Sequence, residues 1–496
     1  MTANGPPHEP PAVGPRSIFV NRTLNLRSIR AIGYDMDYTL VHYRVDQWEG
    51  RAFAHGTARL AALGWPVDAL AFDPASVIRG LVIDRDLGNL LKATRFGYVI
   101  RAAHGTRFLD FDAVRDTYAG VLVDLADDRF EFMNTLFSLS EASLYGQIVD
   151  LVDAGALPGR VSYADGYEVV RQVIDGSHQE GELKAEILAD PDRFIDLDED
   201  IVLALRDQRH AGRRLMLITN SDWDYVQQVM AFAFDRFLPG GHTWRDLFDA
   251  VIVSAAKPSF FTSGNPLYKV VDEENALLRP HHGSIAPGEA FFGGNARQVE
   301  ESLGLSGDEI LYVGDHLFGD VQFSKALLRW RTALILRELE SEVEALVEFL
   351  PGQQALAELM EEKQGLEAEL STLRLAEQRI RLGYGPADVS PARPQKSIDA
   401  LRGRLAALDD RIAPLARQAG MVRNPAWGPL MRSGLDKSLF AGQVERYADI
   451  YTSRVSNFLT STPFALLRAT RIDLPHDPPL GAIPQAGALR ARDTSQ

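Results

Sequence analysis

The sequence predicts an α/β protein with a Rossmann-like parallel sheet, a large inserted cap domain and a helical hairpin arm. Three observations lead to this prediction. Four short apolar runs each end in polar residues, amphipathic segments precede two of them, and about 175 residues separate the first run from the second. Strands that alternate with helices form parallel sheets, and ligands bind beyond the carboxyl ends of such strands. The four polar clusters should therefore meet at one edge of the sheet.

The four apolar runs are rich in Ile, Val and Leu, which suits strands that are buried on both faces. Helices are expected over 198–212, where Gly212 ends the pattern, and over 297–307. The four runs are IRAIGYDMD (29–37), RRLMLITNSD (213–222), FDAVIVSAAKP (248–258) and DEILYVGDHLFGD (308–320).

The long gap after the first run predicts an inserted lobe, because it is far longer than one crossover needs. Its place after a strand end would make this lobe a cap over the carboxyl edge. The Pro-rich N-terminus is expected to be disordered. The predicted division is a disordered tail (1–16), a first core part (17–44), a cap insertion with some core contribution (45–205), a second core part (206–345), an arm (346–420), a C-terminal helical segment packing on core and cap (421–480) and a tail (481–496).

Two stretches with heptad spacing predict the arm. Between Ile398 and Leu415 the apolar spacing is 3-4-3-4-3, and within 355–382 a Leu or Ile recurs every seven residues. The loop GYGPADVSPARP (383–394) joins them, so we expect an antiparallel helical hairpin. Such an arm serves as a structural element or an oligomer contact, and we expect a homo-oligomer.

Composition narrows the functional class. The chain of 496 residues carries 68 acidic and 52 basic side chains, a formal net charge of −16, which argues against binding to a nucleic-acid backbone. The absence of cysteine excludes disulfides, thiolate zinc sites and cysteine nucleophiles. The N-terminus lacks the apolar core of a signal peptide, and no apolar run is long enough to span a membrane. We therefore expect a cytoplasmic protein with neither nucleic-acid nor membrane partners.

The acidic residues of the first and last clusters suit phosphoryl transfer. Asp35 is placed to act as a carboxylate nucleophile, and Asp37, two residues later on the same side, as general acid and then base. Because a carboxylate and a phosphoryl group are both anionic, their reaction requires a cation, and Mg²⁺ takes oxygen ligands. Asp315 and Asp320 supply two further carboxylates.

The middle clusters supply the groups that bind phosphate. Lys257 offers a fixed positive charge, while Thr219 and Asn220 offer hydroxyl and N–H donors to phosphate oxygens. Taken singly, the paired aspartates could be a solvated turn, Lys257 a surface lysine and the 219–221 stretch a helix cap. Four clusters with complementary chemistry in one order favour the phosphoryl-transfer interpretation.

These stretches resemble the motifs of the haloacid dehalogenase superfamily. DMDYTL, ITNSDWDY, AKPSFF and ILYVGDHLFGD are similar to those of its IMP/GMP-preferring cytosolic purine 5′-nucleotidase family. The resemblance covers roughly residues 17–475. It extends to RGLVIDRDLGNLLK (79–92), AAHG (102–105), NTLFSL (134–139) and RSGLDKSLFAGQVERYADIY (432–451).

The resemblance implies a Mg²⁺-dependent 5′-nucleotidase that hydrolyses purine nucleoside monophosphates through an aspartyl-phosphate, with phosphate transfer to another nucleoside as a second activity. Asp35, the backbone carbonyl of Asp37 and Asp315 would hold Mg²⁺, with Asp320 in support. Thr219 and Lys257 would bind the phosphate. The family also suggests a dimer or tetramer.

The stretch RQVIDGSHQEGELK (171–184) matches the part of the family that binds the purine and the ribose. From the residues alone, Phe137 would be a core residue, and Arg171 with Asp175 an ion pair on one helix face. Gln179 stands where mammalian members carry a tyrosine. The substrate contacts implied by the resemblance are Asn134, Phe137, Arg171, Asp175, His178 and Lys184.

A nucleotide effector site is also implied, at Phe318, Gln443, Arg446 and Tyr447. Two departures bear on it: Ala326 stands where a lysine is expected, although Lys325 is adjacent, and the C-terminus lacks the acidic tail of the mammalian enzyme.

Two alternatives remain beside the purine nucleotidase. One is a phosphatase of the same superfamily that acts on a different small phosphomonoester, which would not need an Arg, Asp and aromatic pocket for a base. The other is a nucleotide-sensing protein without activity, against which the complete set of candidate catalytic residues argues.

Overall fold

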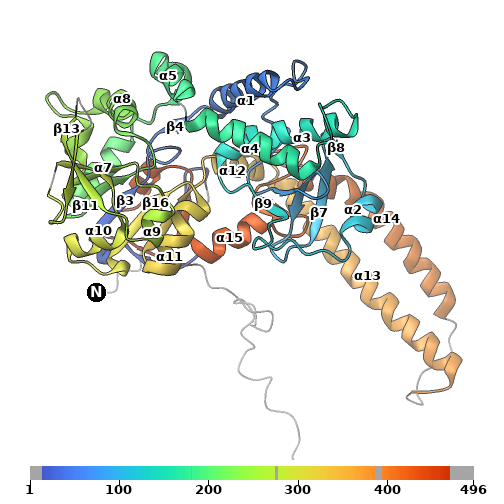
Figure 1. Ribbon diagram of the computed structural model, residues 1–496. Coiled ribbons are helices and arrows are strands. Elements are labelled where there is room, and N and C mark those ends of the chain that lie inside the picture. Colours follow the sequence, from blue (N-terminus) through green and yellow to red (C-terminus); the bar gives the residue numbers. More distant parts are fainter. Residues whose placement is uncertain (1–13, 180, 274–276, 287, 386–393, 470–496) are drawn as a thin grey trace, which may run out of the picture.

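The computed structural model describes residues 14–179, 181–273, 277–286, 288–385 and 394–469 (Figure 1). The predicted C-terminal tail, most of the N-terminal tail and most of the 383–394 loop lie outside these residues. The disordered tail was expected to reach residue 16, and this is wrong at its end. Arg16 donates hydrogen bonds to Asn457 Oδ1 at 2.8 Å and to Ser456 Oγ at 2.6 Å, so the chain is already fixed there.

A ten-stranded sheet forms the centre of the molecule. Its seven middle strands run parallel, whereas β1, β13 and β14 at the two edges pair antiparallel. All four predicted strands are present, as β3, β11, β12 and β16, and the mostly parallel α/β fold is confirmed. The spatial order is β1 (Phe19–Val20), β20 (Ile450–Thr452), β17 (Arg331–Ile335), β16 (Ile310–Gly314), β3 (Ala31–Tyr34), β11 (Arg214–Ile218), β12 (Ala250–Val253), β15 (Glu289–Gly293), β13 (Leu267–Asp272) and β14 (Leu277–His281).

Helices cover the sheet on both faces, because successive residues of a strand point to opposite sides. Leu215 and Leu217 of β11 belong to the apolar cluster that includes α7 (Ile201–His210) and α8 (Trp223–Phe234). Met216 and Ile218 belong to the cluster on the other face, with α9 (Ser259–Thr262) and α10 (Ala296–Leu303), and α11 (Phe323–Leu328) also packs against it. The two predicted helices, 198–212 and 297–307, are present as α7 and α10.

The chain between β4 (His42–Tyr43) and α7 forms helices and a second, antiparallel sheet of five strands. In Figure 1, α1, α3 and α4 lie along the top of the molecule and this sheet lies below them on the right. The elements are α1 (Val45–Ala62), β5 (Val82–Asp84), β6 (Asn89–Ala93), β7 (Val99–His104), β8 (Arg107–Phe108), α2 (Phe111–Tyr118), β9 (Phe130–Phe132), α3 (Leu139–Asp153), α4 (Tyr163–Gln179), α5 (Glu182–Ala189), α6 (Pro191–Phe194) and β10 (Ile195–Asp196).

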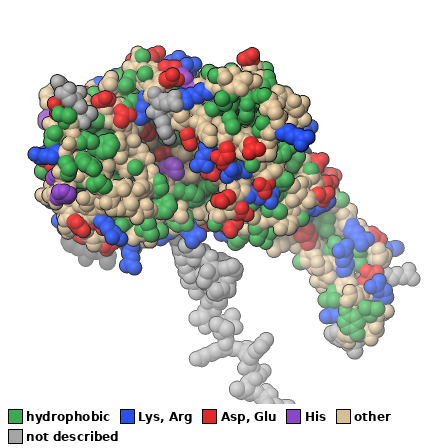
Figure 2. Space-filling model, in the orientation of Figure 1, with side chains coloured by type: hydrophobic (Ala, Val, Ile, Leu, Met, Phe, Trp, Pro, Cys, Tyr) green, Lys and Arg blue, Asp and Glu red, His purple; other side chains and the backbone are tan. Residues whose placement is uncertain are grey.

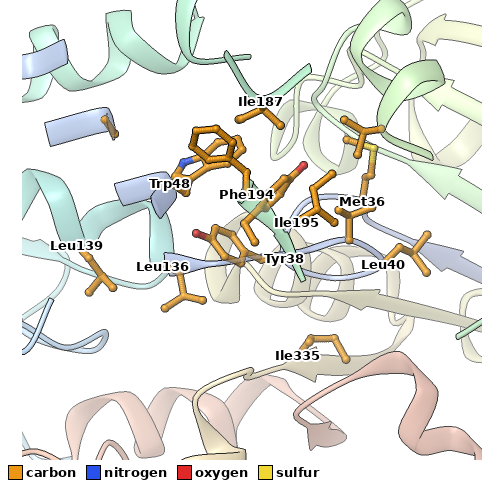
Figure 3. Packing of buried hydrophobic residues seen from close by; sticks show 14 of the residues in the cluster. Met36, Tyr38, Leu40, Trp48, Leu136, Leu139, Ile187, Phe194, Ile195 and Ile335 are labelled. Atoms are coloured by element: carbon orange, nitrogen blue, oxygen red, sulfur yellow. The ribbon is translucent and has the colours of Figure 1, made fainter. Parts of the chain in front are cut away.

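The insertion and the central sheet share one apolar core. Tyr38, the residue directly after Asp37, packs edge-on against Phe137 at 4.8 Å between ring centroids and lies near Trp48 at 6.3 Å. Figure 3 shows Tyr38 and Trp48 together with Phe194 and Leu136, which all come from different elements. The loop after β3 is thus held by side chains of the insertion.

The predicted hairpin arm is present and projects from the body (Figures 1 and 2). It consists of α13 (Leu350–Leu382) and α14 (Pro394–Gly420), which follow α12 (Leu339–Glu348). Leu359, Leu366 and Leu370 of α13 pack against Ile398 and Leu408 of α14 in a cluster of their own. The heptad seams therefore face each other within one chain, and the expected homo-oligomer stays a prediction.

The segment after the arm is only partly helical, which corrects the expectation of a C-terminal helical segment. It contributes α15 (Leu439–Tyr447) and then β20, which joins the central sheet beside β17; two short pairs, β18 (Arg432–Ser433) with β19 (Asp436–Lys437) and β21 (Leu466–Leu467) with β2 (Leu24–Asn25), accompany them. The division into domains otherwise stays a prediction. Among the described residues, every helix is too short or too polar to cross a membrane.

Candidate active site

The site begins where β3 ends. The N–H of Asp35 still donates to the carbonyl of Val313 at 2.9 Å, so the sheet pairing with β16 extends one residue beyond the strand. The chain then turns, and the Met36 N–H donates to Asp35 Oδ1 at 2.8 Å. This bond fixes the buried carboxylate against the end of the sheet.

The carboxylate of Asp37 is held separately from that of Asp35. Its Oδ1 accepts a hydrogen bond from the Tyr43 hydroxyl at 2.6 Å, and its Oδ2 accepts one from the Ser221 hydroxyl at 2.7 Å. Tyr43 also meets the Tyr225 hydroxyl at 3.0 Å. The two aspartates of the first cluster therefore have different surroundings although one residue separates them.

Three buried carboxylates come together at the end of the parallel strands. Asp35, Asp315 and Asp320 each offer an oxygen atom, and these atoms lie within 4.8 Å of one another. Asp315 and Asp320 follow β16, which pairs directly with β3. The Asp37 carboxylate is not among these oxygens. The predicted convergence of the first and last clusters is confirmed in the geometry.

Lys257 lies inside this acidic cluster. Its Nζ is 2.7 Å from Asp35 Oδ1 and 2.7 Å from Asp320 Oδ1, and its side chain is almost completely buried. The Tyr312 hydroxyl accepts a third hydrogen bond from Nζ at 3.1 Å. One lysine thus bridges the first and last clusters across the sheet edge.

Electrostatics reflect this burial. Burial raises the pKa of Asp35 to about 6, against the opposing charge of Lys257. Burial and the neighbouring carboxylates of Asp320 and Asp35 raise the pKa of Asp315 well above its usual range. Burial would lower the pKa of Lys257, but Asp320 and Asp35 outweigh it and raise that pKa instead. A cluster with this excess of negative charge favours a further cation.

The second predicted cluster lies at the end of β11. Thr219 is fully buried, and its Oγ1 accepts the Ser221 N–H at 3.1 Å. The side chain of Asn220 binds the backbone of Lys257, and the phosphate contact expected of the Asn220 N–H stays a prediction. Its Oδ1 accepts the Lys257 N–H at 2.6 Å, and its Nδ2 donates to the Lys257 carbonyl at 3.1 Å. Asn220 therefore fixes the backbone of the segment that carries Lys257.

The candidate substrate residues come from the insertion. Phe137 lies against Tyr38, close to the end of β3, and Asn134 Oδ1 accepts the Phe318 N–H at 3.5 Å. Lys184 pairs with Asp222 at 2.9 Å and lies over the Tyr225 ring, which places its charge near Asp37.

Arg171 and Asp175 form the helix pair that the sequence also allowed, at 3.9 Å on α4, and Arg171 reaches Glu131 at 3.4 Å. The side chains of His178 and Gln179 lie outside the described residues.

The four candidate effector residues lie on two neighbouring elements. Phe318 belongs to the helical turn Leu317–Gln322, which contacts α15, where Gln443, Arg446 and Tyr447 lie. Lys325 does not extend this set, because its Nζ donates to both carboxylate oxygens of the buried Asp449 at 2.7 Å.

Sequence reasoning missed two residues that contact Asp315. The Thr135 hydroxyl donates to Asp315 Oδ2 at 3.2 Å, and Arg79 Nη1 donates to the Asp315 carbonyl at 3.1 Å. Both lie in stretches that carry the family resemblance, 79–92 and 134–139, yet neither has a local pattern that marks a role. Their contacts bring the insertion into the site.

Comparisons with known proteins identify the family of the chain. The model of the 5′ nucleotidase family matches residues 18–479. A 5′-nucleotidase domain-containing protein of Dictyostelium discoideum is 26% identical over 486 residues, which are 94% of this chain and 76% of that protein.

Similar solved structures include an archaeal beta-phosphoglucomutase from a hyperthermophilic Pyrococcus species, at 8% identity, 62% of this chain, 87% of that chain and a TM-score of 0.31. They also include a haloacid dehalogenase-like hydrolase from Xanthomonas campestris, at 12% identity, 62% of this chain, 82% of that chain and a TM-score of 0.24. The assignment rests on the family match, which spans most of the sequence: the chain belongs to the 5′ nucleotidase family and is a hydrolase.

Proposed function

We propose that this protein hydrolyses purine nucleoside 5′-monophosphates of the IMP/GMP type to nucleoside and phosphate. The observation that carries the proposal is the buried group of Asp35, Asp315 and Asp320 with Lys257 between them, in a chain of the 5′ nucleotidase family. Nucleophile, cation ligands and phosphate-binding charge then lie at one sheet edge.

The donor set fits Mg²⁺. Three carboxylates whose oxygens lie within 4.8 Å of one another offer the hard oxygen ligands that this ion prefers, and the family resemblance adds the Asp37 carbonyl. Bound there, the ion would offset the negative charge of the phosphoryl group and of the nucleophile. The Thr135 hydroxyl and the Arg79 guanidinium would hold Asp315 in place.

The reaction would proceed in two steps. An oxygen of Asp35 attacks phosphorus while the bond from phosphorus to the 5′ oxygen breaks, and Asp37 gives its proton to the departing nucleoside. Asp37 then takes a proton from water, which attacks the aspartyl-phosphate and releases phosphate and the free Asp35 carboxylate. Tyr43 and Ser221 orient Asp37 for both transfers. Lys257, the Thr219 hydroxyl and the backbone N–H of Asn220 would bind the phosphoryl oxygens.

Substrate selection would lie in the insertion. Phe137 and Asn134 adjoin the site through Tyr38 and Phe318, and Lys184 lies beside Tyr225. Arg171 and Asp175 would read the edge of the purine. A second nucleoside in place of water would accept the phosphoryl group, which makes phosphate transfer a second activity. Whether Phe318, Gln443, Arg446 and Tyr447 bind a nucleotide effector is tested by adding ATP to the same assay.

A substrate panel tests the proposal. Purified protein with Mg²⁺ should release phosphate from IMP or GMP faster than from pyrimidine nucleotides or sugar phosphates. Activity on sugar phosphates alone would instead favour the alternative of a phosphatase with another substrate.

A variant pair tests the mechanism and the non-enzyme alternative. Asp35→Asn should abolish turnover, whereas Asp207→Asn, an exposed aspartate on α7, should not change it. Equal turnover by the Asp35→Asn variant would contradict the aspartyl-phosphate route. A wild type inactive on every phosphomonoester, yet stabilised by a purine nucleotide, would favour the nucleotide-sensing protein.

A further inference from the structure

The guanidinium of Arg79 is completely buried beside the acidic cluster. Its Nε and Nη2 donate to the two carboxylate oxygens of Glu338 at 2.7 and 2.6 Å. Its Nη1 donates to the Asp315 carbonyl at 3.1 Å and lies 3.9 Å from Asp315 Oδ2. One planar group therefore connects Glu338 with both the backbone carbonyl and the carboxylate of Asp315. The side chain of Glu338 keeps 21% of its surface exposed.

The surroundings of Arg79 leave it little freedom. The next residue, Gly80, has φ +84°, and a Cβ there would lie 2.6 Å from Cβ of Phe440 on α15. The Arg79 guanidinium itself lies 5.5 Å from the centre of the Phe440 ring. The Gly80 N–H donates to the Met133 carbonyl at 2.7 Å, next to the stretch that carries Thr135. The backbone at Gly80 thus packs closely against α15, while the Arg79 guanidinium points towards Asp315.

This arrangement is poorly explained as a device for stability. A buried ion pair costs desolvation that its attraction repays only in part, and an apolar pair of similar volume often serves equally well. What an apolar pair could not do is hold the Asp315 backbone and carboxylate in one orientation. Outer partners of metal ligands commonly have this role, and their loss weakens metal affinity about 10- to 100-fold.

We propose that Arg79 is a positioning residue that holds Asp315 in its ligand orientation, with Glu338 orienting the guanidinium. The inference rests on the proposed function, in which Asp315 is a ligand of Mg²⁺. A lysine at position 79 would keep the charge but would lose the planar fork that reaches Glu338 and Asp315 at once.

The first experiment compares Arg79→Lys with Arg213→Lys. Arg213 is a matched control, because it is also buried and also donates to backbone carbonyls, those of Leu26 and Ile29. It directly precedes β11 and therefore lies away from the carboxyl edge of the sheet. Mg²⁺ binding is measured without substrate, by the shift of the thermal unfolding midpoint over a titration. Arg79→Lys should raise the half-saturating Mg²⁺ concentration about tenfold or more, and Arg213→Lys less than twofold.

The second experiment separates positioning from folding. The double variant Arg79→Met with Glu338→Met removes the pair without leaving a lone buried charge, so its unfolding midpoint without Mg²⁺ should return towards that of the wild type. Its half-saturating Mg²⁺ concentration should stay raised about tenfold. A purely structural role predicts that both quantities recover together, which would overturn the inference.

The remaining outcomes are distinguishable. If the wild type binds Mg²⁺ and Arg79→Lys binds it equally well, the positioning role is wrong and the proposed function stands. If the wild type binds no Mg²⁺ at all, the metal-dependent function fails, and the inference fails with it.

Discussion

At the scale of single residues, the two aspartates of the DMD motif have different partners. Asp35 joins the carboxylate cluster, while Asp37 faces the hydroxyls of Tyr43 and Ser221. The spacing predicted that both would lie at one strand end. It did not indicate Tyr43 or Ser221 as partners, because a hydroxyl six residues away, or 184 residues away, leaves no periodic signal. The contacts of Arg79 and Thr135 with Asp315 were not predicted for the same reason.

The hydroxyl of Tyr43 should matter for turnover. Tyr43→Phe removes the 2.6 Å hydrogen bond that orients Asp37, so kcat should fall about tenfold while KM stays within about twofold. Tyr225→Phe is the control, since the Tyr225 hydroxyl meets Tyr43 rather than Asp37. Steady-state kinetics on IMP measure both; an equal loss in the two variants would assign the effect to packing instead.

Gly314 at the end of β16 should tolerate no side chain. A Cβ there would lie 2.4 Å from Oδ2 and 2.7 Å from Cβ of Asp320, and the Cβ atom cannot move without the backbone. Gly314→Ala should therefore lower the free energy of unfolding by about 1–3 kcal/mol and displace Asp320 from the cluster. Urea unfolding and turnover are the measurements. Gly120→Ala, where a Cβ meets nothing within 4 Å, should change neither, and a stable, active Gly314→Ala would refute the assigned crowding.

At the scale of elements, the strands that carry the site were predictable and several others were not. Long Ile, Val and Leu runs identified β3, β11, β12 and β16. The strand β15 (EAFFG) contains no Ile, Val or Leu, and β20 (IYT) has three residues with a single Ile, so neither has such a run. Periodicity does not separate short apolar stretches from buried helix segments. The part of the sheet that holds the candidate catalytic groups is thus also the part with the clearest sequence signal.

The arm should behave as an element with its own core. Leu366 is 6% exposed in the seam between α13 and α14, whereas Leu375 on the same helix is 44% exposed. Leu366→Ala should cost the arm about 2–4 kcal/mol of local stability, and Leu375→Ala less than about 1. Hydrogen exchange of the arm amides measures this difference.

Turnover should stay unchanged in both arm variants, because the seam residues contact one another and not the site. A loss of activity with Leu366→Ala would show instead that the arm supports the active site, either within the chain or through an oligomer.

At the scale of the whole molecule, one carboxylate connects three distant parts of the chain. Glu340, in the first turn of α12, accepts hydrogen bonds from Arg454 Nε at 2.5 Å and Nη2 at 3.0 Å, just after β20. It also pairs with Arg337, whose Nη2 reaches Asp196 of the insertion at 3.0 Å. The second core part, the last strand and the insertion therefore meet in one network of charges.

This network should make part of the stability depend on pH. Burial alone would raise the pKa of Glu340, but the hydrogen bonds and charges of Arg454 and Arg337 lower it to about 2. Because the folded-state pKa lies below the unfolded value of about 4.5, the contribution is fully present above pH 5 and is lost as pH falls towards 2. Its size at pH 7 is up to about 3 kcal/mol.

Glu340→Gln tests the assignment by urea unfolding at pH 7, 4 and 3. The variant should be less stable than the wild type by about 2–3 kcal/mol at pH 7. The difference should shrink steadily as pH falls, because the wild type then loses the stabilisation from the charged Glu340 carboxylate, which the variant lacks at every pH. Glu344→Gln, an exposed position on the same helix, should be neutral throughout. A stability loss that is the same at all three pH values would mean that Glu340 contributes through packing rather than through its charge.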